Sequence, residues 1–224
     1  MSHFRFVRYT LLLFSVFTLQ HAVFAEPPNL ANLVKEVKAY HDKGAYQKDL
    51  SQVINNARDF INERAAKNKL QLEPKKLAIV LDIDETSLSN YNEMVANEFT
   101  YSKVRWRKAV FAANAPSIKP MLSLYQDAIK HDISVFFVTG RHESAKEPTI
   151  KNLKNAGYQG WTALYLRPEN YTQKSIIPFK SGLRKNLVQQ GFTIIASIGD
   201  QYSDLQGGYT EKTFKLPNPY YYIP

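Results

Sequence analysis

The sequence predicts an α/β fold of three layers, in which helices cover both faces of a parallel sheet. Short apolar segments alternate with helical patterns along most of the chain, as expected of parallel strands joined by helices. The first of these segments, Leu77–Leu81, is apolar at every position, which is typical of a strand buried on both faces. Acidic residues follow it directly, and parallel sheets place their chemistry beyond the carboxyl ends of their strands.

Residues 1–25 have the pattern of a signal peptide. A basic start with Arg5 and Arg8 precedes a mostly apolar stretch, and Ala25 is a small residue before the expected cleavage site. The apolar stretch is short for a membrane span, and the alternative is an anchor helix that stays in place. We expect an exported protein, periplasmic or secreted, with no stable membrane anchor after cleavage. The remaining 224 − 25 = 199 residues suffice for one domain, assigned to 26–224.

The composition limits the classes of partner. The net charge is +9, and removal of Arg5 and Arg8 leaves +9 − 2 = +7, which favours encounters with anionic small molecules. The lysines are scattered, without the basic block typical of a nucleic-acid-binding arm, so no nucleic-acid partner is expected. The chain has no cysteine, so it forms no disulfides and carries no lipid on an N-terminal cysteine. An oligomer remains possible.

Two helices are expected before the first strand. Asn29 can cap a helix over 30–40, and Gly44 separates it from a second helix over about 46–67. Both are expected to pack beside the sheet as scaffold.

The segment of about 89–120 is expected to form a small helical cap over the active face. It is rich in aromatic residues and follows the acidic turn of the first strand directly. Tyr91 and Trp106 are candidates for lining a substrate pocket, although aromatic residues in such a segment more commonly pack it against the body.

The remaining elements alternate regularly. Further strands are predicted at 133–138, 161–166, 192–198 and 213–215, and helices at 121–131, 144–156 and 179–190. Ser144 is a candidate helix cap. The tyrosine-rich tail is expected to pack against the sheet and end the fold.

Two acidic side chains stand at the end of the first strand. Asp82 and Asp84 share one face, because strand side chains alternate with period two. Like charges held this close repel, so a structure that keeps both usually supplies a cation or a proton. The alternative is a polar strand end with helix-capping residues.

Other strand ends carry groups of matching chemistry. Thr139 follows the second strand, Lys180 opens a helix, and Asp200 with Asp204 follows the fourth strand. The carboxyl ends of parallel strands meet at one edge, so these groups can converge there. Carboxylates without cysteine and with few histidines form a hard-oxygen site, which suits Mg²⁺. A lysine and a threonine hydroxyl beside the metal would hold phosphate oxygens.

These motifs together resemble those of the haloacid dehalogenase (HAD) superfamily. The order is DxDxT, a strand ending in threonine, a lysine and GDxxxD, carried by Asp82, Asp84, Thr86, Thr139, Lys180, Gly199, Asp200 and Asp204. More narrowly, the segments DIDETSLSN, FFVTGR, YLRP and FKLPNPYYYIP look like the acid phosphatases of HAD subfamily IIIB. The resemblance covers nearly all of the chain after the signal peptide and implies an HAD-like Rossmannoid fold.

The resemblance also implies roles for individual residues. Asp82 matches the nucleophile that takes the phosphoryl group, and Asp84 matches the general acid and base. Thr139, Gly140 and Lys180 match the phosphate-binding positions. The implied Mg²⁺ ligands are Asp82, Asp84 and Asp200, with Asp204 in support.

Arg141 follows the second strand, where it could bind phosphate or pair with a surface carboxylate. Arg184 lies one helical turn after Lys180 and is interpreted as structural support.

The expected function is therefore an exported Mg²⁺-dependent acid phosphatase that acts on small phosphomonoesters through an aspartyl-phosphate. The alternative is a non-catalytic storage or binding protein on the same fold. Storage-protein relatives can lack the nucleophile, whereas Asp82 is present here.

Overall fold

The structure is a computed structural model that describes residues 27–223. The predicted signal peptide at 1–25 lies outside these residues. Within residues 27–223, no helix combines the length and the apolar character needed to cross a membrane.

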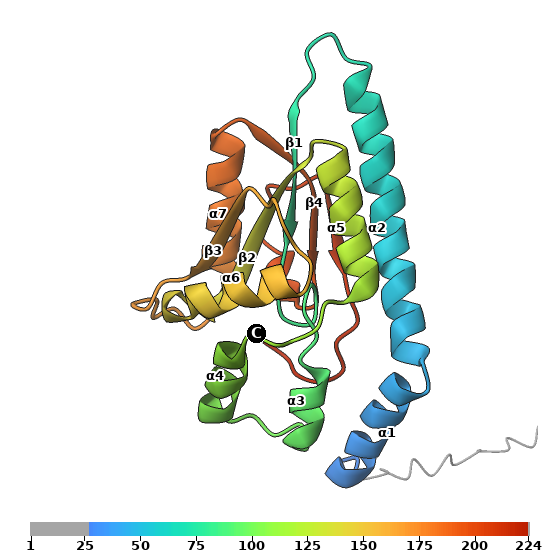
Figure 1. Ribbon diagram of the computed structural model, residues 1–224, viewed down its shortest axis with the longest axis vertical. Coiled ribbons are helices and arrows are strands. Elements are labelled where there is room, and N and C mark those ends of the chain that lie inside the picture. The colour runs from blue at the N-terminus through green and yellow to red at the C-terminus, as the bar shows by residue number, and fades with distance from the viewer. Residues whose placement is uncertain (1–26, 224) are drawn as a thin grey trace, which may run out of the picture.

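A five-stranded sheet in the order β3-β2-β1-β4-β5 forms the middle layer, and every pair of neighbouring strands is parallel (Figure 1). The strands are β1 (Lys76–Leu81), β2 (Ser134–His142), β3 (Ala163–Arg167), β4 (Phe192–Gly199) and β5 (Lys212–Lys215). The strand order reverses direction at β1, and ligands of open parallel sheets bind at such switch points. The predicted α/β fold is confirmed.

Helices cover both faces of this sheet. On one face, α2 (Ala45–Lys69) and α5 (Lys119–Lys130) pack against β-strand side chains such as Ile79 and Phe137. On the other face, α7 (Ile177–Gln189) packs Leu187 against Val80 and Phe136. The larger apolar cluster lies under α2 and α5, so the central strand is buried on both sides, as its uninterrupted apolar sequence predicted.

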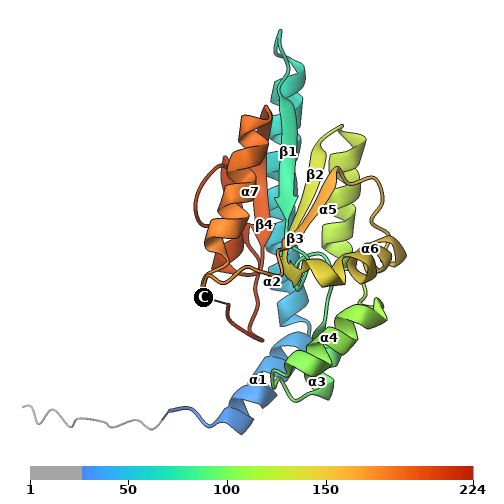
Figure 2. The same ribbon diagram turned by 90° about the vertical axis from the view of Figure 1, so that its left-hand side faces the viewer.

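The first helix, α1 (Leu30–Asp42), does not belong to the scaffold beside the sheet, which corrects the expectation. Asn29 caps it as predicted, because its Oδ1 accepts hydrogen bonds from the amides of Ala31 and Asn32. However, α1 has no buried residue. The chain turns at Gly44, whose φ of 87° is in the left-handed region, and α1 thereby projects past the carboxyl ends of the strands (Figures 1 and 2).

Two short helices, α3 (Tyr91–Ala96) and α4 (Lys103–Ala112), lie in the predicted cap segment. Both lie beyond the carboxyl ends of the strands, and α3 lies between α4 and α1 (Figures 1 and 2). The helix α6 (Lys146–Asn155) follows a 3₁₀ turn at Glu143–Ala145. The expected capping by Ser144 was wrong: α6 begins after Ala145 without a side-chain cap, and the Ser144 amide donates to Glu169 instead, at 2.8 Å.

Candidate active site

Asp82 lies directly beyond β1, in the middle of the sheet edge. Its amide donates to the Ile198 carbonyl at 3.1 Å, which continues the pairing of β1 with β4 by one residue. The residue is 6% exposed. Its carboxylate accepts a hydrogen bond at 2.7 Å from Nζ of Lys180, a residue in the first turn of α7. The backbone of β1 therefore holds this carboxylate at the switch point, and α7 supplies its counter-charge.

Asp200 and Asp204 complete an acidic cluster around Asp82. One carboxylate oxygen from each of the three lies within 4.8 Å of the others, and all three residues are buried. Lys180 contacts both Asp82 and Asp204, so one cation faces three carboxylates. This excess of buried oxygen ligands fits a divalent metal ion, and an all-oxygen set suits a hard cation. The three residues could hold such an ion.

A glycine permits the close approach of Asp204. A Cβ placed on Gly199 would lie 2.3 Å from the Asp204 Cβ and 2.3 Å from its Oδ2. Asp204 Oδ2 also accepts from the Gln201 amide at 2.9 Å. Gly199 is thus required so that the turn after β4 can fold its acidic side chain back against the strand end.

Burial perturbs the charges of the cluster. It raises the pKa of Asp82 well above its usual value, and the neighbouring Asp204 carboxylate raises it further. Burial and the same neighbour raise the pKa of Asp200 to about 6. For Lys180, burial acts to lower the pKa, but the carboxylates of Asp204 and Asp82 outweigh it and raise the pKa. Without further positive charge, the cluster therefore resists full ionisation.

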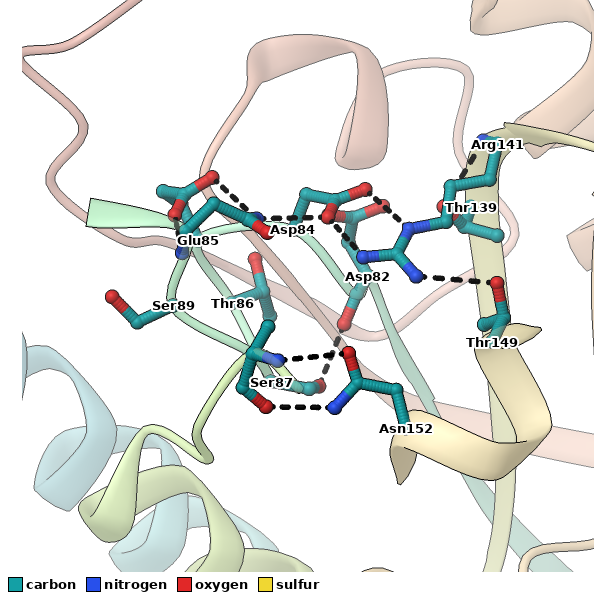
Figure 3. Close-up of polar contacts among 12 residues, drawn as sticks. Asp82, Asp84, Glu85, Thr86, Ser87, Ser89, Thr139, Arg141, Thr149 and Asn152 are labelled. Atoms are coloured by element: carbon teal, nitrogen blue, oxygen red, sulfur yellow. Dashed lines mark hydrogen bonds and ion pairs between the residues drawn. The ribbon is translucent and has the colours of Figure 1, made fainter. Parts of the chain in front are cut away.

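Asp84 has a different environment, although it is only two residues from Asp82. Both of its oxygens accept from the Arg141 guanidinium, from Nε at 3.0 Å and from Nη2 at 2.6 Å (Figure 3). The side-chain amide of Asn90 donates a further hydrogen bond to Asp84 Oδ1 at 2.9 Å. Thr149 accepts from the remaining Arg141 nitrogen at 3.2 Å and holds the guanidinium from its far side (Figure 3). Arg141 was expected either to bind phosphate or to pair with a surface carboxylate. In the structure it pairs with a carboxylate, but that carboxylate is Asp84 of the site.

Glu85 is a buried acidic residue that sequence analysis left without a role. It adopts a φ of 53° and accepts from the Asn90 amide N–H at 2.6 Å and the Asn90 side chain at 3.1 Å. Burial raises its pKa to about 8, with the neighbouring Asp84 adding to the effect. Glu85 thus ties the acidic turn to the start of α3, and its burial could be known only from the tertiary structure.

The predicted phosphate-binding residues lie at the same edge. Thr139 is buried within β2, and its hydroxyl accepts from the Arg141 amide at 3.2 Å. Gly140 has open space on its side-chain face, since an added Cβ would meet no atom within 4 Å. Lys180 contacts Asp82, as described above. Their roles toward phosphate remain predictions.

The two candidate pocket aromatics lie in packed positions. The Tyr91 ring stacks on His41 of α1, and its hydroxyl donates to Asp42 at 2.7 Å. Trp106 packs against a small cluster that includes Ala145 and Leu166. These contacts join the cap segment to α1 and to the body, and their contribution to substrate binding stays a prediction.

Polar residues of the C-terminal tail also reach the site, which the sequence did not predict. The tail does not simply pack against the sheet: Asn218 donates to Asp200 at 2.6 Å, and the Tyr221 hydroxyl donates to Glu85 at 3.1 Å. Arg184 has the expected supporting role, since it donates to the carbonyls of Asp204, Gln206 and Gly208. The only signal for the tail was a polar asparagine between two prolines, which a loop would also explain.

Comparisons with known proteins agree with this geometry. A family model described as HAD superfamily, subfamily IIIB (acid phosphatase), matches residues 16–224. Acid phosphatase 1 of Solanum lycopersicum is 34% identical over 201 residues, which cover 88% of this chain and 76% of that protein. Vegetative storage protein 2 of Arabidopsis thaliana is 34% identical over 149 residues, covering 65% of this chain and 56% of that protein.

A solved structure shows the same fold. The class C acid phosphatase from Bacillus anthracis superposes with a TM-score of 0.70 at 22% identity, over 86% of each chain. The family model spans the acidic cluster, the Asp84–Arg141 pair and the tail alike. The chain therefore belongs to subfamily IIIB of the HAD superfamily, the acid phosphatases, and is a phosphomonoesterase of the HAD type.

Proposed function

We propose that this protein is an exported Mg²⁺-dependent acid phosphatase that hydrolyses small phosphomonoesters through an aspartyl-phosphate. The observation that carries the proposal is the buried cluster of Asp82, Asp200 and Asp204 around a single lysine. Three carboxylates at the switch point of a parallel sheet are costly to bury unless a cation compensates them. A phosphatase of this type needs that arrangement, because an anionic carboxylate must approach an anionic phosphate.

Asp82 is the proposed nucleophile. One of its oxygens forms a bond to phosphorus while the bond from phosphorus to the leaving oxygen breaks and its electron pair stays on that oxygen. Lys180 lies 2.7 Å from the Asp82 carboxylate and would reduce the repulsion between the two anions. Thr139 and the amides around Gly140 would hold the equatorial oxygens of the transferring group.

Asp84 is the proposed acid and base. It gives its proton to the leaving oxygen, and it then takes a proton from the water that attacks the aspartyl-phosphate. Attack releases inorganic phosphate and restores the Asp82 carboxylate. Arg141 fixes the orientation of Asp84 through two hydrogen bonds. Because Asp84 must carry a proton when the leaving group departs, we expect an acidic optimum.

The metal residues would be Asp82, Asp200 and the backbone of Asp84, with Asp204 supporting them through Lys180. A bound Mg²⁺ would supply positive charge against the phosphate oxygens and would favour the ionised form of the buried carboxylates. Export is supported by the signal-peptide pattern of residues 1–25.

The experiment is hydrolysis of p-nitrophenyl phosphate by the purified protein, with and without EDTA. We expect loss of activity in EDTA and recovery when Mg²⁺ is added in excess. Acid quenching during turnover, followed by mass spectrometry, should detect phosphate on the peptide that contains Asp82. Full activity in the chelator would refute the metal requirement, and phosphate on another residue would refute the nucleophile.

A second candidate is a storage or binding protein, favoured by the similarity to Vegetative storage protein 2. A folded, Mg²⁺-loaded sample that turns over no member of a phosphomonoester panel would support it. The intact acidic cluster argues against it, since storage does not need a buried excess of negative charge.

A further inference from the structure

The last residues of the chain cross the carboxyl edge of the sheet and contact the acidic cluster. We name residues 217–223 the C-terminal strap. It begins after Leu216, whose amide donates to the Gly199 carbonyl at 2.9 Å, immediately before Asp200. The strap therefore starts beside the strand end that carries the proposed metal carboxylate.

Asn218 of the strap makes a direct contact with this carboxylate. Its Nδ2 donates to Asp200 Oδ2 at 2.6 Å, and Gln201 Nε2 donates to the same oxygen at 2.7 Å. Thr86 donates to the other oxygen, Oδ1, at 3.2 Å. Asp200 is thus held by three donors, and two of them fix one oxygen.

The orientation of the Asn218 amide is set by its other end. Its Oδ1 accepts from the Tyr220 amide at 2.8 Å and from the Tyr221 amide at 3.4 Å. Because the oxygen faces these backbone donors, the NH₂ group must face Asp200. A strap turn therefore aims the donor at the carboxylate.

Gln201 is fixed by the strap as well. Its Oε1 accepts from the Ile223 amide at 3.0 Å, and its Nε2 lies 3.4 Å from the Tyr221 carbonyl. Both donors to Asp200 Oδ2 consequently depend on residues 217–223.

The middle of the strap is anchored on the cap side. The Tyr220 ring centroid lies 5.5 Å from that of Tyr91 and 5.9 Å from that of Phe99. Tyr221 donates to Glu85 at 3.1 Å. These contacts join the strap to α3 and to the acidic turn after β1, so its position is fixed at several points around the site.

We infer that Asn218 is a positioning residue that orients the Asp200 carboxylate for the metal ion, with the C-terminal strap as its support. The inference rests on the proposed function, because it concerns the same metal. Partners that hydrogen-bond metal ligands fix their orientation, and loss of one such partner typically weakens metal binding about 10–100-fold. Gln201 remains in place when Asn218 is replaced, so the lower end of that range is expected.

The test is titration of Mg²⁺, and separately Mn²⁺, into metal-free protein by calorimetry. Asn218→Ala should weaken binding about tenfold. Asn218→Ser is the second variant: its hydroxyl can still accept from the Tyr220 amide, but it is too short to reach Asp200, so the same loss is expected. Tyr222→Ala is the matched control, because this side chain belongs to the strap and is 74% exposed. It should bind the metals as the wild type does.

The outcomes separate this inference from the proposed function. Absence of Mg²⁺ and Mn²⁺ binding in the wild type would overturn the proposed metal site itself. Wild-type binding that is lost in Asp200→Asn but unchanged in both Asn218 variants would overturn the inference alone. Melting temperatures in EDTA provide the readout for a merely structural role: lower melting temperatures with unchanged metal affinity would also overturn it.

Discussion

Asp82 and Asp84 are two residues apart, yet the tertiary structure gives them opposite electrostatic environments. Asp82 is on the β4 side of the switch point, among two further carboxylates and one shared lysine. Asp84 is on the β2 side, where Arg141 neutralises it one to one through both oxygens. The first environment has one lysine for three carboxylates, whereas in the second one guanidinium balances one carboxylate.

The two environments allow one acidic turn to supply two chemical roles. A carboxylate that needs an added cation is suited to meet a phosphate together with a metal ion. A carboxylate that is held by a rigid planar guanidinium has a defined orientation, which proton transfer requires. The distinction is created by residues from three other parts of the chain: Arg141 in β2, Lys180 in α7, and the two aspartates of the turn after β4.

Neutralising each aspartate in turn should give the largest effects. Asp82→Asn should lower turnover roughly 10⁴–10⁶-fold for every substrate, as loss of a nucleophile does. Asp84→Asn should lower it roughly 10²–10⁴-fold. The second loss should be smaller for p-nitrophenyl phosphate than for an alkyl phosphate, because p-nitrophenolate leaves without a proton. Equal losses on both substrates would contradict the acid role of Asp84.

The crowding around Asp204 gives the next largest effect. Gly199→Ala places a Cβ against Asp204, and we expect about 1–3 kcal/mol of lost stability together with weaker metal binding. Gly182→Ala is the control, because nothing lies within 4 Å of its added Cβ and alanine is the better helix former. Thermal melts and metal titrations measure both. A Gly199→Ala protein as stable as the Gly182→Ala protein would show that the close approach is not needed.

The pairing of Asp84 with Arg141 can be tested by changing the guanidinium. Arg141→Lys removes the two-pronged contact while it keeps the charge, so kcat/KM should fall roughly 10–100-fold through misplacement of Asp84. Thr149→Val removes only the hydrogen bond to Arg141 Nη1 and should have a smaller effect in the same direction. If Arg141→Lys retained wild-type kcat/KM on an alkyl phosphate, a positive charge beside Asp84 would be sufficient and the two-pronged geometry would not be needed.

The ion pair between Arg64 and Glu211 lies outside the surroundings of Asp82 and Asp84, and its loss should have the smallest effect. The hydrogen bond from Arg64 holds the pKa of Glu211 below its usual 4.5. A lowered folded pKa adds stability above the unfolded value, and this stability is lost as the pH falls through the folded value. We expect Glu211→Gln to cost about 0.2–1 kcal/mol at pH 7 and less below pH 4.5. Chemical denaturation at pH 7 and pH 3.5 measures the difference, and an equal cost at both would contradict the assignment.

Local patterns made much of the fold predictable. The uninterrupted apolar segment before Asp82 predicted a central strand, and Asn29 predicted its helix cap, because both signals depend only on neighbours in the chain. Two local predictions failed. Ser144 does not cap α6, because it lies inside the 3₁₀ turn Glu143–Ala145 and Ala145 occupies the capping position. The left-handed turn at Gly44 directs the preceding helix, α1, away from the body.

Carboxylates, a threonine and a lysine after successive predicted strands can be read from the amino-acid sequence, and parallel topology is enough to bring them to one edge. Which of these groups pair depends on the packing of the folded chain. The contacts of Arg141 with Asp84 and of Asn218 with Asp200 join residues 57 and 18 positions apart. Such pairs depend on how strand ends and tail pack together, and no local pattern encodes that packing.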